Sequence, residues 1–282
     1  GGNTNYFLGE VSAAGWHHYF PAVYVLKEPL ALLLFIFVAL SLTFNRIIRR
    51  TIARTRAIRE RILDYLQVNF AEFSMAVFVA MYWSYSIVSN LNIGFRHLIP
   101  ALPFIYILSA GVWKRWENNK RYVLLGALML WFFISTVAAT PHFLSYFNRL
   151  GGGIQYGYRY VTDSNYDWGQ DLIRLKKFVE SRPEVDKIAV DYFGGGNPQY
   201  YLGGKVEYWW SARGSPKEQG ISWLAVSVNT LQGAVQPLAP NHERKPQDEY
   251  SWLTELRPPA PGLGNVPEPD FRAGTSIFIY KL

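Results

Sequence analysis

Long apolar runs alternate with charged segments in the first half of this chain, and the pattern changes after about residue 140. A helix that crosses a bilayer needs about 20 apolar residues, each rising about 1.5 Å. Four runs approach or exceed this length, at about 21–44, 70–89, 98–113 and 122–140. The third run is short and carries Pro100 and Pro103, so it also fits a broken or re-entrant helix.

A soluble all-α core is the alternative interpretation of these runs. Helices of such a core show a polar stripe, whereas the first and fourth runs are apolar on every side. Tyrosine and tryptophan also gather near the ends of the runs, as they do at membrane interfaces. The pattern therefore favours membrane helices. The aromatic residues concerned are Trp16, Tyr19, Trp113 and Trp116.

Two basic segments between the runs predict the orientation in the membrane. Since short cytoplasmic loops carry an excess of lysine and arginine, we expect both segments to face the cytoplasm. Residues 1–20, the loop around 90–97 and everything after residue 140 then face outward. The basic residues are Arg46, Arg49, Arg50, Arg54, Arg56, Arg59 and Arg61 in one segment, and Lys114, Arg115, Lys120 and Arg121 in the other.

Charge is distributed unevenly. Residues 1–140 hold 13 Lys and Arg against 6 Asp and Glu, and residues 141–282 hold 15 of each. Because the positive excess lies in the apolar half, it indicates topology and contact with anionic lipid better than nucleic-acid binding. The chain has no cysteine, which excludes disulfides, thiolate metal ligands and a cysteine nucleophile.

The tail, 141–282, predicts a small α/β domain. A helix is expected within 167–184, and strands within 187–193, 205–210, 221–231 and 275–282. The proline-rich stretch 232–273 is expected to be largely loop. The predicted fold is therefore a polytopic α-helical membrane protein of about four transmembrane helices (residues 1–140) with a C-terminal extracytoplasmic α/β domain (residues 141–282).

Polar residues beside the predicted spans are the first candidates for chemistry. Arg96 and His97 precede the third span, where a guanidinium and an imidazole could bind a phosphate at headgroup depth. Lys27 and Glu28 lie within the first span, where ionisable residues are usually functional. The alternatives are interfacial anchoring for Arg96 and His97 and a snorkelling side chain for Lys27.

The densest polar stretch is "TDSNYDWGQD", residues 162–171. Asp163, Asn165 and Asp167 could bind sugar hydroxyls or a divalent cation, and Trp168 could stack on a sugar ring. Capping of the helix that follows is the alternative. The stretch lacks the glycine and terminal glutamate of an EF-hand, and the chain shows no metal-spaced histidine set, so no metal site or cofactor is predicted.

Three stretches resemble, in the same order, the C-terminal portion of bacterial GT-C type glycosyltransferases. This resemblance is to the family related to dolichyl-phosphate-mannose–protein mannosyltransferases, glycosyltransferase family 39, and it covers roughly residues 5–180. The stretches are "YFLGEVSAAGWHHYFPAVYVLKEPLALLL", "NIGFRHLIPALPFIYIL" and "PHFLSYFNRLGGGIQYGYRYVTDSNYDWGQDLIRLKKFV".

The resemblance implies an enzyme that uses a polyprenyl-phosphate-linked sugar as donor, in the plasma or inner membrane, with transfer on its outer face. Arg96, His97 and Lys27 would then bind the donor phosphate. Asp163, Asn165, Asp167 and Trp168 would face the sugar or the acceptor. The partners that the resemblance implies are the polyprenyl-phosphate sugar donor and the lipid bilayer. It implies no nucleic-acid partner.

The resemblance also implies that the catalytic acidic residues lie upstream. The chain begins "GGNTNYFLGE" without methionine, so we interpret it as a fragment whose catalytic residues are unknown here. Two further hypotheses stay open: a non-catalytic membrane protein whose outer domain binds glycan or a protein partner, and a transporter of lipid-linked sugar. The transporter is disfavoured because the spans carry few polar residues.

Overall fold

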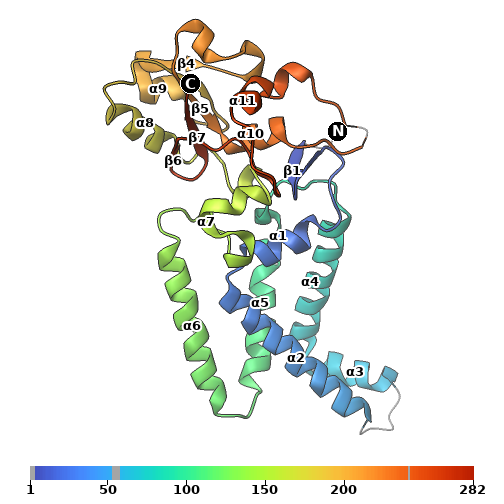
Figure 1. Cartoon of the computed structure of the whole chain (residues 1–282). Helices are drawn as coiled ribbons and strands as arrows, with labels where there is room; N and C mark the ends of the chain where they lie inside the picture. Colours follow the sequence, from blue (N-terminus) through green and yellow to red (C-terminus); the bar gives the residue numbers. More distant parts are fainter. Residues whose placement is uncertain (1–3, 53–57, 241) are drawn as a thin grey trace. The chain divides into compact units, whose positions relative to one another are not determined.

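The chain divides into two compact units (Figure 1). The computed structural model describes residues 4–52, 58–240 and 242–282, so Arg54 and Arg56 lie outside the described residues. The helical unit comprises residues 20–89 and 95–140, and the sheet unit comprises 1–19, 90–94 and 141–282. Residues 4–19 and 90–94 thus join the C-terminal part, although the sequence pattern suggested a single boundary near residue 140.

The helices of the first 140 residues follow the apolar runs, with one break that the sequence pattern did not predict. The run expected as a single span over 21–44 is two helices, separated at Glu28 and Pro29. Proline has no N–H to donate and clashes with the preceding turn, which ends a helix. The elements are α1 (Tyr19–Lys27), α2 (Leu30–Ile52), α3 (Ile58–Val68), α4 (Phe70–Val88), η1 (Phe95–Leu98), α5 (Leu102–Lys114) and α6 (Lys120–Ala138).

Among the described residues, three helices are long and apolar enough to cross a membrane: α2, α4 and α6. Few of their side chains are buried within the protein, and Phe37, Met129 and Phe133 are each more than 60% exposed. Exposed apolar surface on this scale is unfavourable in water and favourable in lipid. About four spans were predicted, and three helices have the required length. The remaining helix, α5, has 13 residues and reaches only about 20 Å.

The helical unit is held together around α2, which packs against α5 and α6. The Trp113 ring stacks on Phe35 at 5.4 Å, and its indole N–H donates to the Phe35 carbonyl at 2.9 Å. Ala31, Ala39 and Leu128 complete this cluster. Small alanines let the helices approach closely, which is how membrane helices pack.

The basic segment expected as a cytoplasmic loop is largely helical where it is described. Helix α2 continues through Arg46 and Arg49, and α3 begins at Ile58. No glycine or proline interrupts residues 45–69, and the arginine, isoleucine, leucine and glutamate residues there support a helix. The charge pattern predicted the side of the membrane and not the local backbone, so the helical structure leaves the cytoplasmic orientation of this segment a prediction.

The sheet unit contains a five-stranded mixed sheet in the order β4-β3-β5-β7-β6. Strands β4, β3 and β5 run parallel, and β7 pairs antiparallel with β5 and β6. The strands are β3 (Ile188–Asp191), β4 (Val206–Tyr208), β5 (Trp223–Ser227), β6 (Phe271–Ala273) and β7 (Ile277–Lys281). The helices include α7 (Gly153–Tyr156), α8 (Leu172–Glu180), α9 (Pro198–Leu202), α10 (Val228–Val235) and α11 (Ser251–Leu256).

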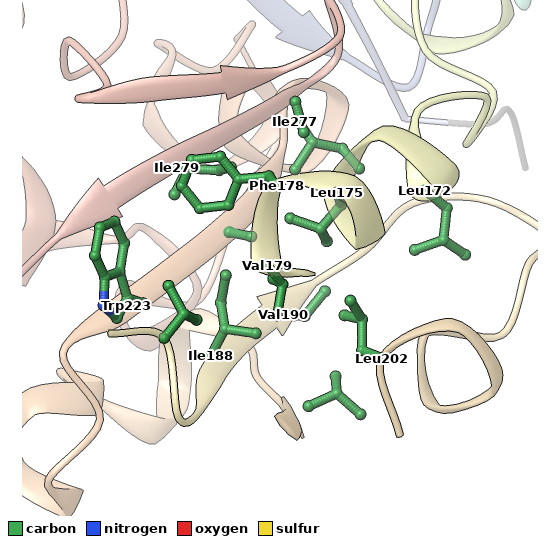
Figure 2. Close-up of a cluster of buried hydrophobic side chains, with 14 residues drawn as sticks. Leu172, Leu175, Phe178, Val179, Ile188, Val190, Leu202, Trp223, Ile277 and Ile279 are labelled. Carbon is green, nitrogen blue, oxygen red and sulfur yellow. The ribbon is translucent and has the colours of Figure 1, made fainter. Parts of the chain in front are cut away.

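One face of this sheet carries the apolar core (Figure 2). Helix α8 contributes Leu172, Leu175, Phe178 and Val179 from one side, as its periodicity predicts. The strands supply alternating residues such as Ile188 and Val190, together with Ile277 and Ile279. The predicted helix and strands of the tail thus form a common core.

Two parts of the sheet unit differ from the sequence prediction, and a third had no predicted structure. Residues 228–231, expected in a strand, begin α10, because the strand ends at Ser227. The stretch 232–273 includes α11 and β6, although loop was expected. Residues 5–12 form a hairpin of β1 (Asn5–Phe7) and β2 (Glu10–Ser12), whose turn residues Leu8 and Gly9 both have positive φ.

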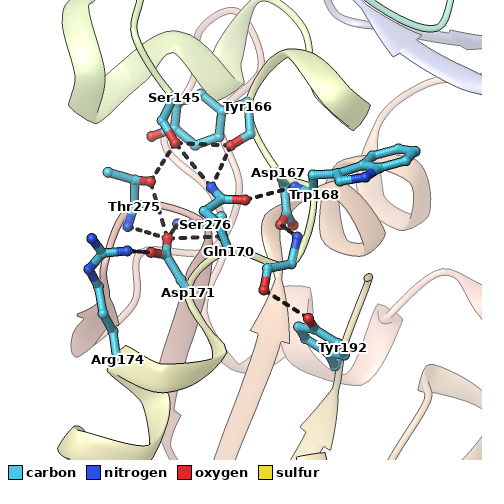
Figure 3. Close-up of polar contacts among 11 residues, drawn as sticks. Ser145, Tyr166, Asp167, Trp168, Gln170, Asp171, Arg174, Tyr192, Thr275 and Ser276 are labelled. Carbon is cyan, nitrogen blue, oxygen red and sulfur yellow. Dashed lines mark hydrogen bonds and ion pairs between the residues drawn. The ribbon is translucent and has the colours of Figure 1, made fainter. Parts of the chain in front are cut away.

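Asp171 anchors the start of α8 to the β6–β7 turn (Figure 3). Its side chain is 0% exposed, and one carboxylate oxygen accepts the backbone N–H and the hydroxyl of both Thr275 and Ser276 at 2.7 to 3.2 Å. Arg174 forms an ion pair with the other oxygen. A buried carboxylate is stable only when such partners satisfy it, so this contact fixes the turn against the helix.

Gly274, in the same turn, provides a test of this anchor. A Cβ on Gly274 would lie 2.1 Å from an Asp171 carboxylate oxygen, whereas a Cβ on Gly220 would meet nothing within 4 Å; both residues have positive φ. We expect Gly274→Ala to destabilise the sheet unit by about 3 kcal/mol or more, since it displaces a buried charge. Gly220→Ala should cost about 1 kcal/mol, from backbone strain alone.

The measurement is the urea midpoint for proteolysis of the sheet unit in the full chain. Equal losses of stability in the two variants would mean that Asp171 is not under this constraint.

Candidate functional site

Arg96 and His97 lie on a single 3₁₀ turn, η1, between α4 and α5. Leu98 is fully buried and anchors the turn, while the Arg96 side chain is exposed. The Phe95 ring stacks on Tyr24 of α1 at 6.3 Å, and the Tyr82 hydroxyl of α4 donates to the His97 carbonyl at 2.7 Å. Helices α1 and α4 therefore hold the turn, and the guanidinium projects from a fixed backbone.

The His97 ring is half-buried, and its Nε2 atom has no hydrogen-bond partner among the described residues. Burial lowers the pKa of His97, and the neighbouring Arg96 charge lowers it further. The imidazole is therefore predominantly neutral at pH 7, and its Nε2 atom is both buried and unsatisfied within the described residues. This unsatisfied polar atom beside an exposed guanidinium is the feature of the helical unit that most resembles a binding site.

Lys27 is the last residue of α1, three positions after Tyr24. Residues three apart share a helix face, so Lys27 lies one turn from the ring that stacks beside Arg96. Glu28 points elsewhere: it is 2% exposed and accepts a hydrogen bond from the Tyr106 hydroxyl of α5 at 2.6 Å. The adjacent Lys27 and Glu28 thus have separate environments, and Glu28 joins α1 to α5.

Asp163 and Asn165 lie together in a short 3₁₀ turn of the sheet unit. Asp163 has a positive φ of 55°, and its backbone N–H donates to the Asn229 side chain at 2.8 Å. Asn165 is fully buried, and its amide donates to the Tyr19 hydroxyl at 2.7 Å. Of these two predicted site residues, Asp163 is the one with partial exposure.

Asp167 and Trp168 have opposite environments (Figure 3). The Asp167 carboxylate is 0% exposed and accepts the backbone N–H of Gly169 at 3.1 Å. Burial raises the pKa of Asp167 to about 7, against the opposing effect of its backbone hydrogen bonds. Trp168 is 49% exposed, and its ring packs edge-on against Phe193. Trp168 can therefore contact a ligand, whereas the Asp167 carboxyl is enclosed by the fold.

The helix-capping interpretation of this stretch is not supported by the contacts. Helix α8 begins after Asp171, and no side-chain cap hydrogen bond forms there. The Asp171 carboxylate binds the β6–β7 turn instead. Within the described residues, no three histidine, aspartate or glutamate side chains form a group that could hold a metal ion.

Comparison of the chain with models of protein families, with curated proteins and with solved structures finds no match.

Sequence reasoning did not assign a role to several residues that the fold brings together. Tyr250 donates from its hydroxyl to Asp191 at 2.7 Å, across 59 positions of sequence. Burial raises the pKa of Asp191 to about 6, although this hydrogen bond opposes the effect. The sequence around Asp191 does not indicate which residue will contact it. Only the tertiary structure therefore shows the pair of Asp191 and Tyr250.

The raised pKa of Asp167 predicts a pH-dependent stability. Between about pH 3.8 and pH 7 the Asp167 carboxyl is protonated in the folded state and ionised in the unfolded state. The free energy of unfolding is therefore highest below this interval and falls as the pH rises through it. Asp191 adds a similar loss of stability, but only up to about pH 6. Between pH 6 and 7 we expect Asp167 to cause a loss of about 1 kcal/mol in the free energy of unfolding, and Asp167→Asn should flatten this part of the profile.

Pulse proteolysis of the sheet unit in urea at pH 5, 6 and 7 measures the profile. The exposed Asp186→Asn serves as control and should keep the slope of the unsubstituted chain. An unchanged slope in Asp167→Asn would show that this carboxyl is already ionised at pH 6.

Proposed function

We propose that this chain is part of a membrane glycosyltransferase that moves a sugar from a polyprenyl-phosphate-linked donor to an acceptor on the outer face of the membrane. The observation that carries the proposal is the η1 turn, where the exposed Arg96 stands beside a neutral His97 with an unpaired buried nitrogen. The three helices long enough to cross a membrane would place the lipid part of such a donor in the bilayer.

The chemistry assigned to this turn is stabilisation of the leaving phosphate. The acceptor atom forms a bond to the sugar carbon and gives up its proton to a base, while the bond from that carbon to the phosphate oxygen breaks. The phosphate gains negative charge as it leaves with the lipid. A guanidinium presents two parallel donors to phosphate oxygens, and the neutral imidazole adds a third donor. Lys27, at the end of α1, is the further residue assigned to the same phosphate. Donors fixed before the reaction lower the barrier, because they need not reorganise as the charge develops.

Arg96→Ala tests this assignment in the full-length protein. Removal of one preorganised donor typically costs a factor of 100 to 1,000 in rate, so we expect a loss of transfer of about a hundredfold or more. Arg96→Lys should retain part of the activity, since it keeps the charge but not the fork. The readout is transfer of labelled sugar from the lipid-linked donor in vesicles, normalised to the amount of inserted protein.

Lys120→Ala, at an exposed position of the same unit, is the matched control and should leave transfer unchanged. Full activity of Arg96→Ala would exclude the phosphate role for this turn.

The proposal also requires the sheet unit to lie outside the cell. Because the chain contains no cysteine, single cysteines can report sidedness directly. Ser222 of the sheet unit and Asn118, between α5 and α6, are both exposed. We expect a membrane-impermeant maleimide to label Ser222→Cys in intact cells and to label Asn118→Cys only after the membrane is opened. The reverse pattern would contradict the proposed transfer on the outer face.

A further inference from the structure

A pocket of about 320 Å³ lies in the sheet unit, apart from the Asp163–Trp168 stretch. One wall is formed by residues that follow β4, and the other by Pro246, Gln247 and helix α11 itself. The position is next to the carboxyl ends of parallel strands β3 and β4, the side of an open α/β sheet where ligands usually bind. The lining residues are Ser211, Ala212, Gly214, Pro246, Gln247, Ser251, Trp252 and Glu255.

Tyr250 fastens the two walls of the pocket to the sheet. Its hydroxyl donates to Asp191, the last residue of β3, and its backbone N–H donates to the Ser211 hydroxyl at 2.7 Å. Tyr250 is fully buried and has a positive φ of 52°, a strained conformation for a bulky side chain. Such strain persists where surrounding contacts impose it, and it concentrates at functional sites.

The lining combines one aromatic surface with a few polar groups. The Trp252 indole is partly exposed, and the Gln247 amide and the Glu255 carboxylate are exposed. The Glu255 carboxylate has no ion pair or hydrogen bond among the described residues, and it is the sole charged group of the lining residues that the structure describes. Among the described lining residues no cation compensates this negative charge, which disfavours phosphates, nucleotides and acidic sugars as ligands.

We propose that this pocket binds an uncharged sugar ring. A pyranose has an apolar face that can pack on the Trp252 indole, and it has hydroxyl groups that can donate to Glu255 and pair with Gln247. The volume is at the lower end of the range for small-molecule sites, which suits one or two rings. The assignment of this ring to the acceptor glycan rests on the proposed function, but the binding itself does not.

Saturation-transfer NMR on the full chain in a sugar-free detergent tests the binding. The probes are the methyl glycosides of glucose, mannose, galactose and N-acetylglucosamine, with methyl glucuronide as the acidic comparison. We expect at least one neutral glycoside to bind, and methyl glucuronide to bind at least tenfold more weakly. Trp252→Ala should weaken neutral binding at least tenfold, and Trp252→Phe should retain most of it.

Two further variants keep the test independent of folding. Glu255 is exposed, so Glu255→Gln should fold normally, weaken neutral binding severalfold and narrow the difference from the glucuronide. Trp210 is 52% exposed and does not line the pocket, so Trp210→Ala should leave binding unchanged. The proposal is overturned if no neutral glycoside binds, if the glucuronide binds as tightly, or if Trp210→Ala weakens binding as much as Trp252→Ala.

The outcome is separable from that of the transferase assay. Glycoside binding without any sugar transfer would contradict the proposed function and leave this inference intact. Transfer that depends on Arg96, without glycoside binding at this pocket, would contradict the inference alone.

Discussion

The buried carboxylate of Asp171 is the constraint on which the sheet unit depends most. A charge with 0% exposure must find several donors, and here they come from two adjacent residues, Thr275 and Ser276, and from Arg174. These contacts join the start of α8 to the β6–β7 turn, more than 100 positions away in sequence. The loop that carries Asp167 and Trp168 directly precedes this anchor, and its path is therefore set by the same contacts.

The helical unit follows a different physical rule. Its apolar side chains largely face outward, so burial within the protein contributes little to its cohesion. Specific contacts between helices replace it, such as the Trp113 indole on the Phe35 carbonyl and the Tyr106 hydroxyl on Glu28. The Glu28 contact lies at the Pro29 break, so the end of α1 and Lys27 are fixed by a polar contact as well as by the proline.

Each of the two units holds one set of polar residues proposed to bind a ligand. In the helical unit, Arg96 and His97 stand on a short turn that Tyr82 and Phe95 hold in place. In the sheet unit, the carboxyl ends of the parallel strands meet the strained Tyr250 and the pocket beside it. We propose that the first set binds a phosphate and the second a neutral ring, because one presents a cation and the other a carboxylate with an indole.

The elements that have a local signal were predictable from the amino-acid sequence. Apolar runs predicted α2, α4 and α6, and period-2 and period-3.6 patterns predicted β3, β7 and α8. The absence of glycine and proline could have indicated the helix through Arg46 and Arg49, but the charge pattern was used only to predict orientation. The break after Lys27 has a local cause in Pro29, which the apolar run concealed. Only the folded structure shows the partners of Asp167 and Asp171 and the pocket around Trp252. These features depend on contacts between residues distant in sequence, and such contacts leave no periodic trace in the chain.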